Sequence, residues 1–214
     1  MPCCSDDLCS SSAAATGRYR LVLWIVLAIN AVMFLAEITA GLAAGSAALQ
    51  ADALDFFADA ANYGISLFVL GLSIRWRARA ALVKGVSMGV FGLWVIGSVI
   101  WHALHGTVPG WGTMGVIGAV ALAANAACLV LLYAWRDGDA NMRSVWICSR
   151  NDVIANLAVL AAALGVFGTG TGWPDIMVAA VMAVLAIQGS AIVVRQAIAE
   201  LRAHGGPDPA PILR

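Results

Sequence analysis

The sequence predicts an all-α integral membrane protein, built as one bundle of six transmembrane helices. The chain has 214 residues, of which 62% are apolar and only 11% are charged, whereas roughly 25% of residues are charged in an ordinary soluble domain. Windows of about 20 residues, the length that spans a bilayer, detect six apolar segments. These segments lie near residues 20–43, 47–73, 81–104, 112–135, 145–168 and 173–195. In addition, Lys and Arg occur only in every second connection between these segments.

The basic residues determine the predicted orientation. The connections near 44–46, 105–111 and 169–172 contain neither Lys nor Arg. The positive-inside rule therefore places both termini and the second and fourth connections in the cytoplasm, in a multi-pass protein of the inner (plasma) membrane. Arg150 lies inside the fifth segment, from which it can snorkel towards the cytoplasmic face. The basic residues assigned to the ends and connections are Arg18, Arg20, Arg75, Arg77, Arg79, Lys84, Arg136, Arg143, Arg195, Arg202 and Arg214.

The expected domain organisation is simple. Residues 18–203 form a membrane domain between a flexible cytoplasmic tail at 1–17 and a short tail at 204–214. The first tail lacks the basic and apolar regions of a signal peptide. Its cysteines, Cys3, Cys4 and Cys9, are expected to be reduced, which favours metal or redox chemistry over disulfides. The net charge is zero and the basic residues are spread along one membrane face, so nothing indicates nucleic-acid binding.

The second segment contains acidic residues that a lipid-facing helix would not tolerate. Asp52, Asp55 and Asp59 are three and four residues apart, and Asn62 follows three residues later. These spacings place the four side chains on one helix face. An ionisable residue inside a membrane faces a cavity, a partner or a substrate path by default. Like charges so close together need a bound cation or protons, so this face is expected to hold something positive.

The fifth segment offers a counterpart to this acidic face. Cys148, Asp152 and Asn156 recur every four residues and form one polar stripe. Two helices that each contribute a ligand pair can surround one ion, and a thiolate with carboxylates suits a divalent transition metal of borderline or soft character. A hydrogen-bonded proton relay or a sodium site would explain the acids equally well, and a lone membrane cysteine often only packs. On the first segment, Asn30 and Glu37 share a face that lines the bundle.

The order of these motifs resembles the cation diffusion facilitator family over roughly residues 20–203. The run GSAALQADALDFFAD is similar to the second helix of that family. In the fifth helix, the family's His-x-x-x-Asp motif lines up with Cys148 and Asp152. Further similarity is found at Asn30, Glu37, Asn125 and the run WPDIMVAAVMAVL.

The resemblance implies a secondary transporter that exports divalent metal from the cytoplasm in exchange for protons. The tetrahedral site implied for the second and fifth helices consists of Asp55, Asp59, Cys148 and Asp152. Asp52 corresponds to a recurrent family acid assigned to site polarity or proton access, and Asn156, Glu37 and Asn30 are further candidates for such support. The implied partners are the metal ion, protons and lipid, with no cofactor besides the transported ion.

The chain departs from the family pattern in two ways. Cys148 replaces the usual histidine, which should favour softer ions such as cadmium or lead without excluding zinc. Proton coupling would then depend on the aspartates or the thiol. The metallochaperone-like carboxy-terminal domain of many relatives is expected to be absent, so a homodimer would be held by membrane helices. Cys3, Cys4 and Cys9 could capture a soft metal, or could be incidental cysteines of a disordered tail.

Other function classes fit less well. The chain contains no Gly-x-x-x-x-Gly-Lys loop, which argues against an ATP-driven pump. An intramembrane aspartyl protease would need one aspartate on each of two helices and little else. A membrane metal sensor without transport activity would use the same ligands, and only a flux measurement separates it from a transporter.

Overall fold

The computed structural model describes residues 6–69, 74–135 and 140–203, and it confirms the all-α prediction for this part of the chain. A short 3-10 helix at Tyr133–Trp135 continues the fourth helix, and the described residues contain no strand. The helices are α1 (Asp6–Ala44), α2 (Ala47–Val69), α3 (Ile74–His105), α4 (Trp111–Leu132), α5 (Ala140–Thr169) and α6 (Trp173–Ala203).

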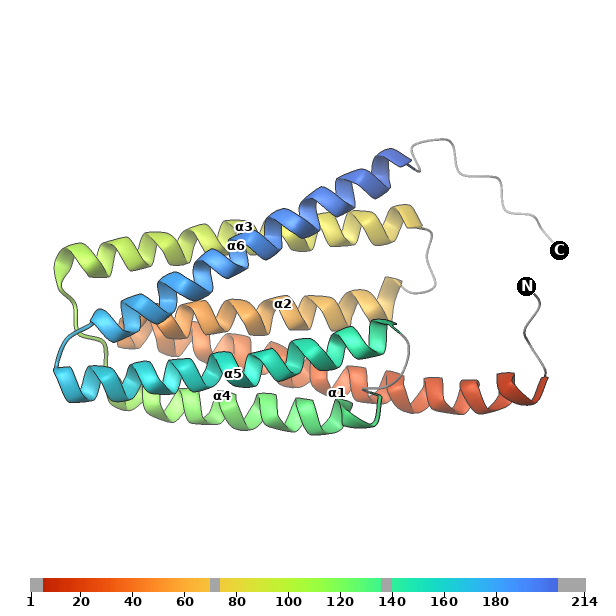
Figure 1. Ribbon diagram of the computed structural model, residues 1–214, viewed down its shortest axis with the longest axis horizontal. Coiled ribbons are helices and arrows are strands. Elements are labelled where there is room, and N and C mark those ends of the chain that lie inside the picture. The colour runs from red at the N-terminus through yellow and green to blue at the C-terminus, as the bar shows by residue number, and fades with distance from the viewer. Residues whose placement is uncertain (1–5, 70–73, 136–139, 204–214) are drawn as a thin grey trace.

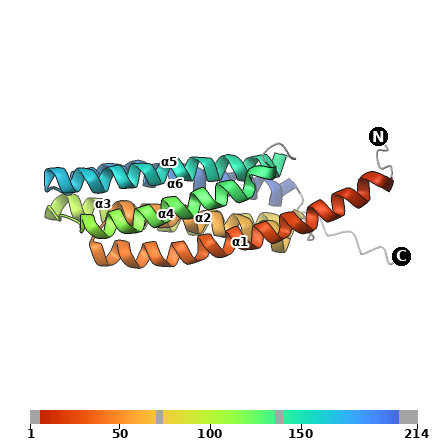
Figure 2. The same ribbon diagram turned by 90° about the horizontal axis from the view of Figure 1, so that it is seen from below.

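The helices run along one axis in an up-and-down bundle (Figures 1 and 2). We call one end the turn end, where residues 45–46, 106–110 and 170–172 connect successive helices, and the other the basic end, where α1 and α3 begin and α6 ends. The most extensive contacts join α3 to α6, α1 to α2 and α4 to α5. Because α2 also contacts α3, α5 and α6, it is the innermost helix.

The outer surface of the bundle is apolar, as expected for a protein in lipid. Every helix except α2 contains a stretch long and apolar enough to cross a membrane, judged over the described residues by length and composition. The 23-residue α2 is long enough, but it carries three aspartates. Large apolar side chains with more than 60% of their surface exposed occur on several helices; examples are Val32, Val90, Leu104, Val130 and Leu164.

Two helix ends differ from the sequence prediction. Helix α1 already begins at Asp6, so most of the segment predicted to be a flexible tail is helical, and it projects beyond the other helices in Figure 1. Alanine in this stretch is a strong helix former. Helix α3 begins at Ile74, so Arg79 and Lys84 belong to the helix rather than to the connection. Hydropathy locates the apolar span, whereas helical hydrogen bonding continues through Arg and Lys, which also favour helices.

The start of α2 is completed by a residue from α6. Ser46 Oγ donates a hydrogen bond to Asp175 Oδ1 at 2.6 Å, and the N–H groups of Ala47 and Ala48 donate to the same carboxylate at 2.8 and 3.2 Å. Ser46 Oγ also accepts from the N–H of Leu49 at 3.1 Å. The first N–H groups of a helix have no partner within the helix, and lipid cannot supply one. Asp175, only 1% exposed, therefore fastens α6 to α2 at the turn end.

Helices α3 and α6 approach closely because glycines lie between them. A Cβ atom at Gly85 would lie 2.8 Å from a methyl group of Val194, and one at Gly89 would lie 2.7 Å from Ser190 Oγ. Ser190 Oγ also donates a hydrogen bond to the carbonyl of Gly85 at 2.7 Å. Small residues at such spacing allow membrane helices to pack backbone against backbone.

Replacing Gly85 with leucine should separate these two helices. The added side chain has no room against Val194, and overpacking of this kind typically costs about 1–3 kcal/mol. The measurement is the thermal unfolding midpoint of the purified protein in detergent. Gly97→Leu on the same helix is the matched control, because nothing lies within 4 Å of a Cβ atom placed there. Equal midpoints for the two variants would contradict the close packing of α3 on α6.

Candidate metal centre

Helices α2 and α5 bring three of the four predicted metal ligands together inside the bundle. The carboxyl groups of Asp59 and Asp152 lie within hydrogen-bonding reach of each other, and Asp55 is close enough to interact electrostatically with both. Asp59 is 8% exposed, whereas Asp55 and Asp152 are half-buried. The two helices run antiparallel and contact each other in the bundle (Figure 1).

Two residues that the sequence reasoning missed hold Asp59. Tyr63 Oη donates a hydrogen bond to Asp59 Oδ2 at 2.8 Å. Lys84 of α3 interacts electrostatically with Asp59 and donates a hydrogen bond to Asn62 Oδ1. The four-residue spacing from Asp59 to Tyr63 was the available signal for the first contact. Nothing in the sequence links Lys84 to this site, because the contact depends on how α3 packs on α2.

The fourth predicted ligand lies outside the side chains that the structure describes. Cys148 belongs to α5, one helical turn before Asp152 on the side of the basic end. The side chains of Cys3, Cys4 and Cys9 are outside the described set as well. Among the side chains that are described, no group of three or more His, Cys, Asp or Glu residues is arranged so that it could hold a metal ion. The described carboxylates thus form a cluster of acids rather than a closed coordination shell.

A second group of polar residues lies next to the three carboxylates, towards the turn end. Asn156 Nδ2 donates a hydrogen bond to Asp52 Oδ1 at 3.0 Å. Glu37 of α1 faces Asp52, near enough for the two carboxyl groups to interact. All three side chains are 0% exposed. Asp52 and Asn156 therefore occupy the next turn of the same two helices that carry the predicted ligands.

Asn30 of α1 bonds to a different helix from the one that Glu37 faces. Its Nδ2 donates to the carbonyl of Val26 at 2.7 Å and contacts Cys128 Sγ of α4 at 3.7 Å. Cys128 is 1% exposed and packs with Tyr19 and Leu132. Asn30 thus connects α1 to α4, and the Cys128 thiol that it contacts is close enough to Asp59 and Asp152 to interact with them electrostatically.

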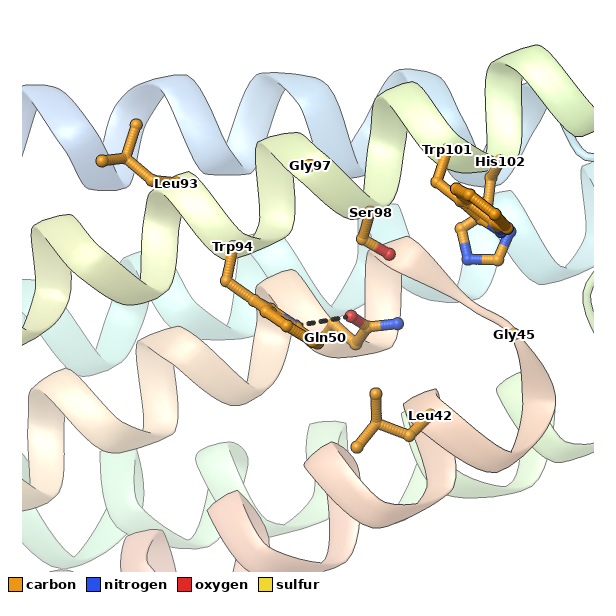
Figure 3. A pocket seen from close by; sticks show the side chains of 9 residues that line it. All are labelled: Leu42, Gly45, Gln50, Leu93, Trp94, Gly97, Ser98, Trp101 and His102. Atoms are coloured by element: carbon orange, nitrogen blue, oxygen red, sulfur yellow. Dashed lines mark hydrogen bonds between the residues drawn. The ribbon is translucent and has the colours of Figure 1, made fainter.

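The hollow shown in Figure 3 is separate from these carboxylates. It has a volume of about 530 Å³ and lies among α1, α2 and α3 near the turn end. Gln50 Oε1 accepts a hydrogen bond from Trp94 Nε1 across it at 3.2 Å. His102 and Trp101 also line the hollow. His105 stacks on Trp101 with ring centroids 3.8 Å apart. Of the predicted metal ligands whose side chains are described, Asp55, Asp59 and Asp152, none lines this hollow.

The fold and the acidic interior define a class of protein: a polytopic helical membrane protein that gathers negative charge where two inner helices meet. The model of the cation efflux transmembrane domain matches residues 23–202. The chain therefore belongs to the cation efflux family, the cation diffusion facilitators, whose members transport metal cations across membranes. The family resemblance seen in the sequence is thereby confirmed.

Proposed function

We propose that this protein exports divalent heavy-metal ions of the zinc, cadmium and lead type from the cytoplasm across the inner membrane, in exchange for protons. The transport site would consist of Asp55, Asp59, Cys148 and Asp152. The observation that supports this proposal most directly is the meeting of Asp59 from α2 with Asp152 from α5 inside the bundle.

The charge of the site supports a divalent ion. Three carboxylates gathered in a poorly solvated interior repel one another unless a cation neutralises them. A divalent metal supplies two positive charges at one point, and Lys84 adds a third nearby. Carboxylate and thiol ligands bind metal in their deprotonated forms, so metal binding and proton binding compete at the same groups. This competition provides the chemistry for exchanging metal against protons.

The distribution of basic residues supports export as the direction. Arg18, Arg79 and Arg202 lie near the basic end, and the turn end carries no Lys or Arg in its three turns. The positive-inside rule assigns the basic end to the cytoplasm. A site open to that end would load metal, and protons arriving from the turn end would displace the metal after the bundle had opened outward.

The proposal is tested by metal flux in proteoliposomes with an imposed pH gradient. Zinc, cadmium, lead and cobalt are offered separately, and the trapped metal is measured with and without the gradient. We expect movement of at least one of these ions, faster when protons flow in the opposite direction. If the protein binds the metals by calorimetry but moves none of them, it acts as a metal sensor instead.

Replacing Cys148 with histidine should shift selectivity towards zinc. A thiolate favours soft ions more strongly than an imidazole does. We expect the ratio of cadmium to zinc transport to fall on the order of tenfold, which corresponds to about 1.4 kcal/mol. Cys128→Ala is the matched control, because it removes a thiol of α4 that the proposal does not count among the ligands. An unchanged ratio in Cys148→His would remove Cys148 from the proposed ligand set.

A further inference from the structure

A groove between α2 and α3 lies on the half of the bundle nearer the basic end (Figure 1). It has a volume of about 480 Å³, and its lining is mostly apolar. The apolar wall includes Phe57, Ala61 and Ile65 of α2 and Trp76 and Val83 of α3. Val83 is 68% exposed and Trp76 is 56% exposed. The groove is therefore open on the outer surface of the bundle, which faces lipid.

Two basic residues of α3 also line this groove, and no Asp or Glu is among the described residues that do so. Arg79 is exposed, and its guanidinium carbon lies 5.2 Å from the ring centroid of Trp76. Lys84 is half-buried, donates a hydrogen bond to Asn62 Oδ1 of α2 and interacts electrostatically with Asp59. An ammonium group has three N–H donors, so it can bond to more than one acceptor at once. The groove thus presents positive charge beside an apolar wall.

The charge and the depth of the groove restrict what can occupy it. Two positive charges repel a metal ion, so the groove does not suit a path for the transported cation. Lys84 belongs to Ala78–His105, a stretch of α3 long and apolar enough to cross a membrane. The inner part of the groove therefore lies at the depth of lipid rather than in bulk water, where a soluble anion would remain. The occupant that fits is an amphiphile with an anionic head and an apolar tail.

The order of the lining residues along α3 matches the order of the parts of a phospholipid. From the basic end, Arg79 comes first, Lys84 follows five residues later, and Ser87 three residues after that. At a rise of 1.5 Å per residue, these positions span about 12 Å along the helix axis. A phosphate between Arg79 and Lys84 brings the ester groups of the glycerol towards the Ser87 hydroxyl. The acyl chains then reach Phe57, which packs on Phe91 of α3 with ring centroids 6.5 Å apart.

We propose that the groove between α2 and α3 binds one anionic phospholipid from the leaflet at the basic end, which the positive-inside rule assigns to the cytoplasm. Its phosphate pairs with Arg79 and Lys84. One of its acyl chains covers Ala61, Ile65 and Val83. Basic pockets between transmembrane helices on the cytoplasmic side are suited to anionic headgroups. The inference is independent of the proposed metal export, because lipid binding is measured without metal.

The test measures lipid binding to the purified chain by native mass spectrometry. The protein is delipidated in detergent and offered dioleoylphosphatidylglycerol, which is anionic, or dioleoylphosphatidylcholine, which has the same acyl chains and no net charge. Glycerol 3-phosphate supplies the anionic head without acyl chains. We expect the chain to retain phosphatidylglycerol at concentrations at which it loses phosphatidylcholine, and we expect glycerol 3-phosphate not to compete.

Three variants locate the binding site. Arg79→Gln removes one charge of the groove, and the affinity for phosphatidylglycerol should fall about fivefold, which corresponds to about 1 kcal/mol for one basic residue at a membrane surface. Arg202→Gln is the matched control, because it removes an exposed charge of α6 near the same end but outside the groove. Ala61→Leu keeps both charges and fills the apolar wall, so it should also weaken binding. The thermal unfolding midpoint of each variant without lipid shows whether the variant is folded.

The outcomes either support the lipid site or overturn it. Equal retention of the two lipids, or equal affinity for phosphatidylglycerol in Arg79→Gln and Arg202→Gln, overturns it. Competition by glycerol 3-phosphate, or unchanged binding in Ala61→Leu, indicates a surface site for anions instead and also overturns it. The melting temperature of the native chain should rise with phosphatidylglycerol more than with phosphatidylcholine, because a ligand stabilises the state that binds it. An equal response to both lipids contradicts the proposal, and none of these results depends on metal flux.

Discussion

Replacing Asp59 with asparagine is expected to abolish metal transport. Asp59 is the carboxylate at which α2 meets α5, since it lies within hydrogen-bonding reach of Asp152 and interacts with Lys84. We expect metal affinity to fall by about 100-fold or more, because even groups that only support a ligand contribute about 10- to 100-fold. Asparagine has nearly the same size and can still accept the hydrogen bond from Tyr63, so the fold should persist. Calorimetry with zinc and cadmium measures affinity, and proteoliposome flux measures transport.

Two variants act as controls for this experiment. Glu200→Gln removes an acid outside the bundle interior and should leave affinity unchanged. Tyr63→Phe keeps the Asp59 charge but removes the hydrogen bond of 2.8 Å that orients it, so we expect an intermediate loss of about tenfold. Undiminished flux in Asp59→Asn would mean that the metal crosses the membrane without this carboxylate, and the proposed transport site would have to be abandoned.

The largest effect on stability is expected from Asp175→Ala. The substitution deprives Ser46 Oγ and the N–H groups of Ala47 and Ala48 of their acceptor. A buried donor left without a partner costs about 1–3 kcal/mol, and hydrogen bonds to charged groups are at the stronger end. We therefore expect a loss on the order of 3 kcal/mol or more in the free energy of unfolding. Thermal denaturation of the purified protein in detergent measures this loss.

Asp175→Asn is the matched control for this change. Its side chain retains one oxygen acceptor but presents an NH₂ group where the second carboxylate oxygen lay, so its stability should fall between those of the native protein and Asp175→Ala. The folded fraction of either variant should keep the native preference among metals, because Asp175 lies at the turn end, away from the proposed ligands. A native-like melting temperature for Asp175→Ala would show that α2 does not depend on this cap.

The features that could be predicted from the sequence are those determined by local spacing. Hydropathy located every helix, and the spacing of Asp52, Asp55 and Asp59 placed them on one face. Contacts between helices could not be predicted in this way. The Ser46–Asp175 hydrogen bond joins residues 129 positions apart, and the contact of Lys84 with Asn62 depends on the packing of α3 on α2. Periodicity shows which face of a helix is polar but not which partner covers it.

Asn30 and Glu37 illustrate the same limit on a single helix. Seven residues apart, they share a face of α1, and spacing alone does not distinguish their roles. In the bundle α1 contacts both α4 and α2. Asn30 bonds to Cys128 of α4, whereas Glu37 faces Asp52 of α2. Their different environments arise from the neighbours of α1.

The cap that Asp175 places on α2 has a consequence for biogenesis. A membrane protein is synthesised from its amino-terminus, so α2 emerges and inserts long before α6 exists. Until Asp175 arrives, the first N–H groups of α2 lack their acceptor, and lipid offers no substitute. The helix that carries the three aspartates is therefore capped only after the sixth helix has been synthesised. A nascent chain that ends before Trp173 lacks the groups that secure its second helix as well as its sixth.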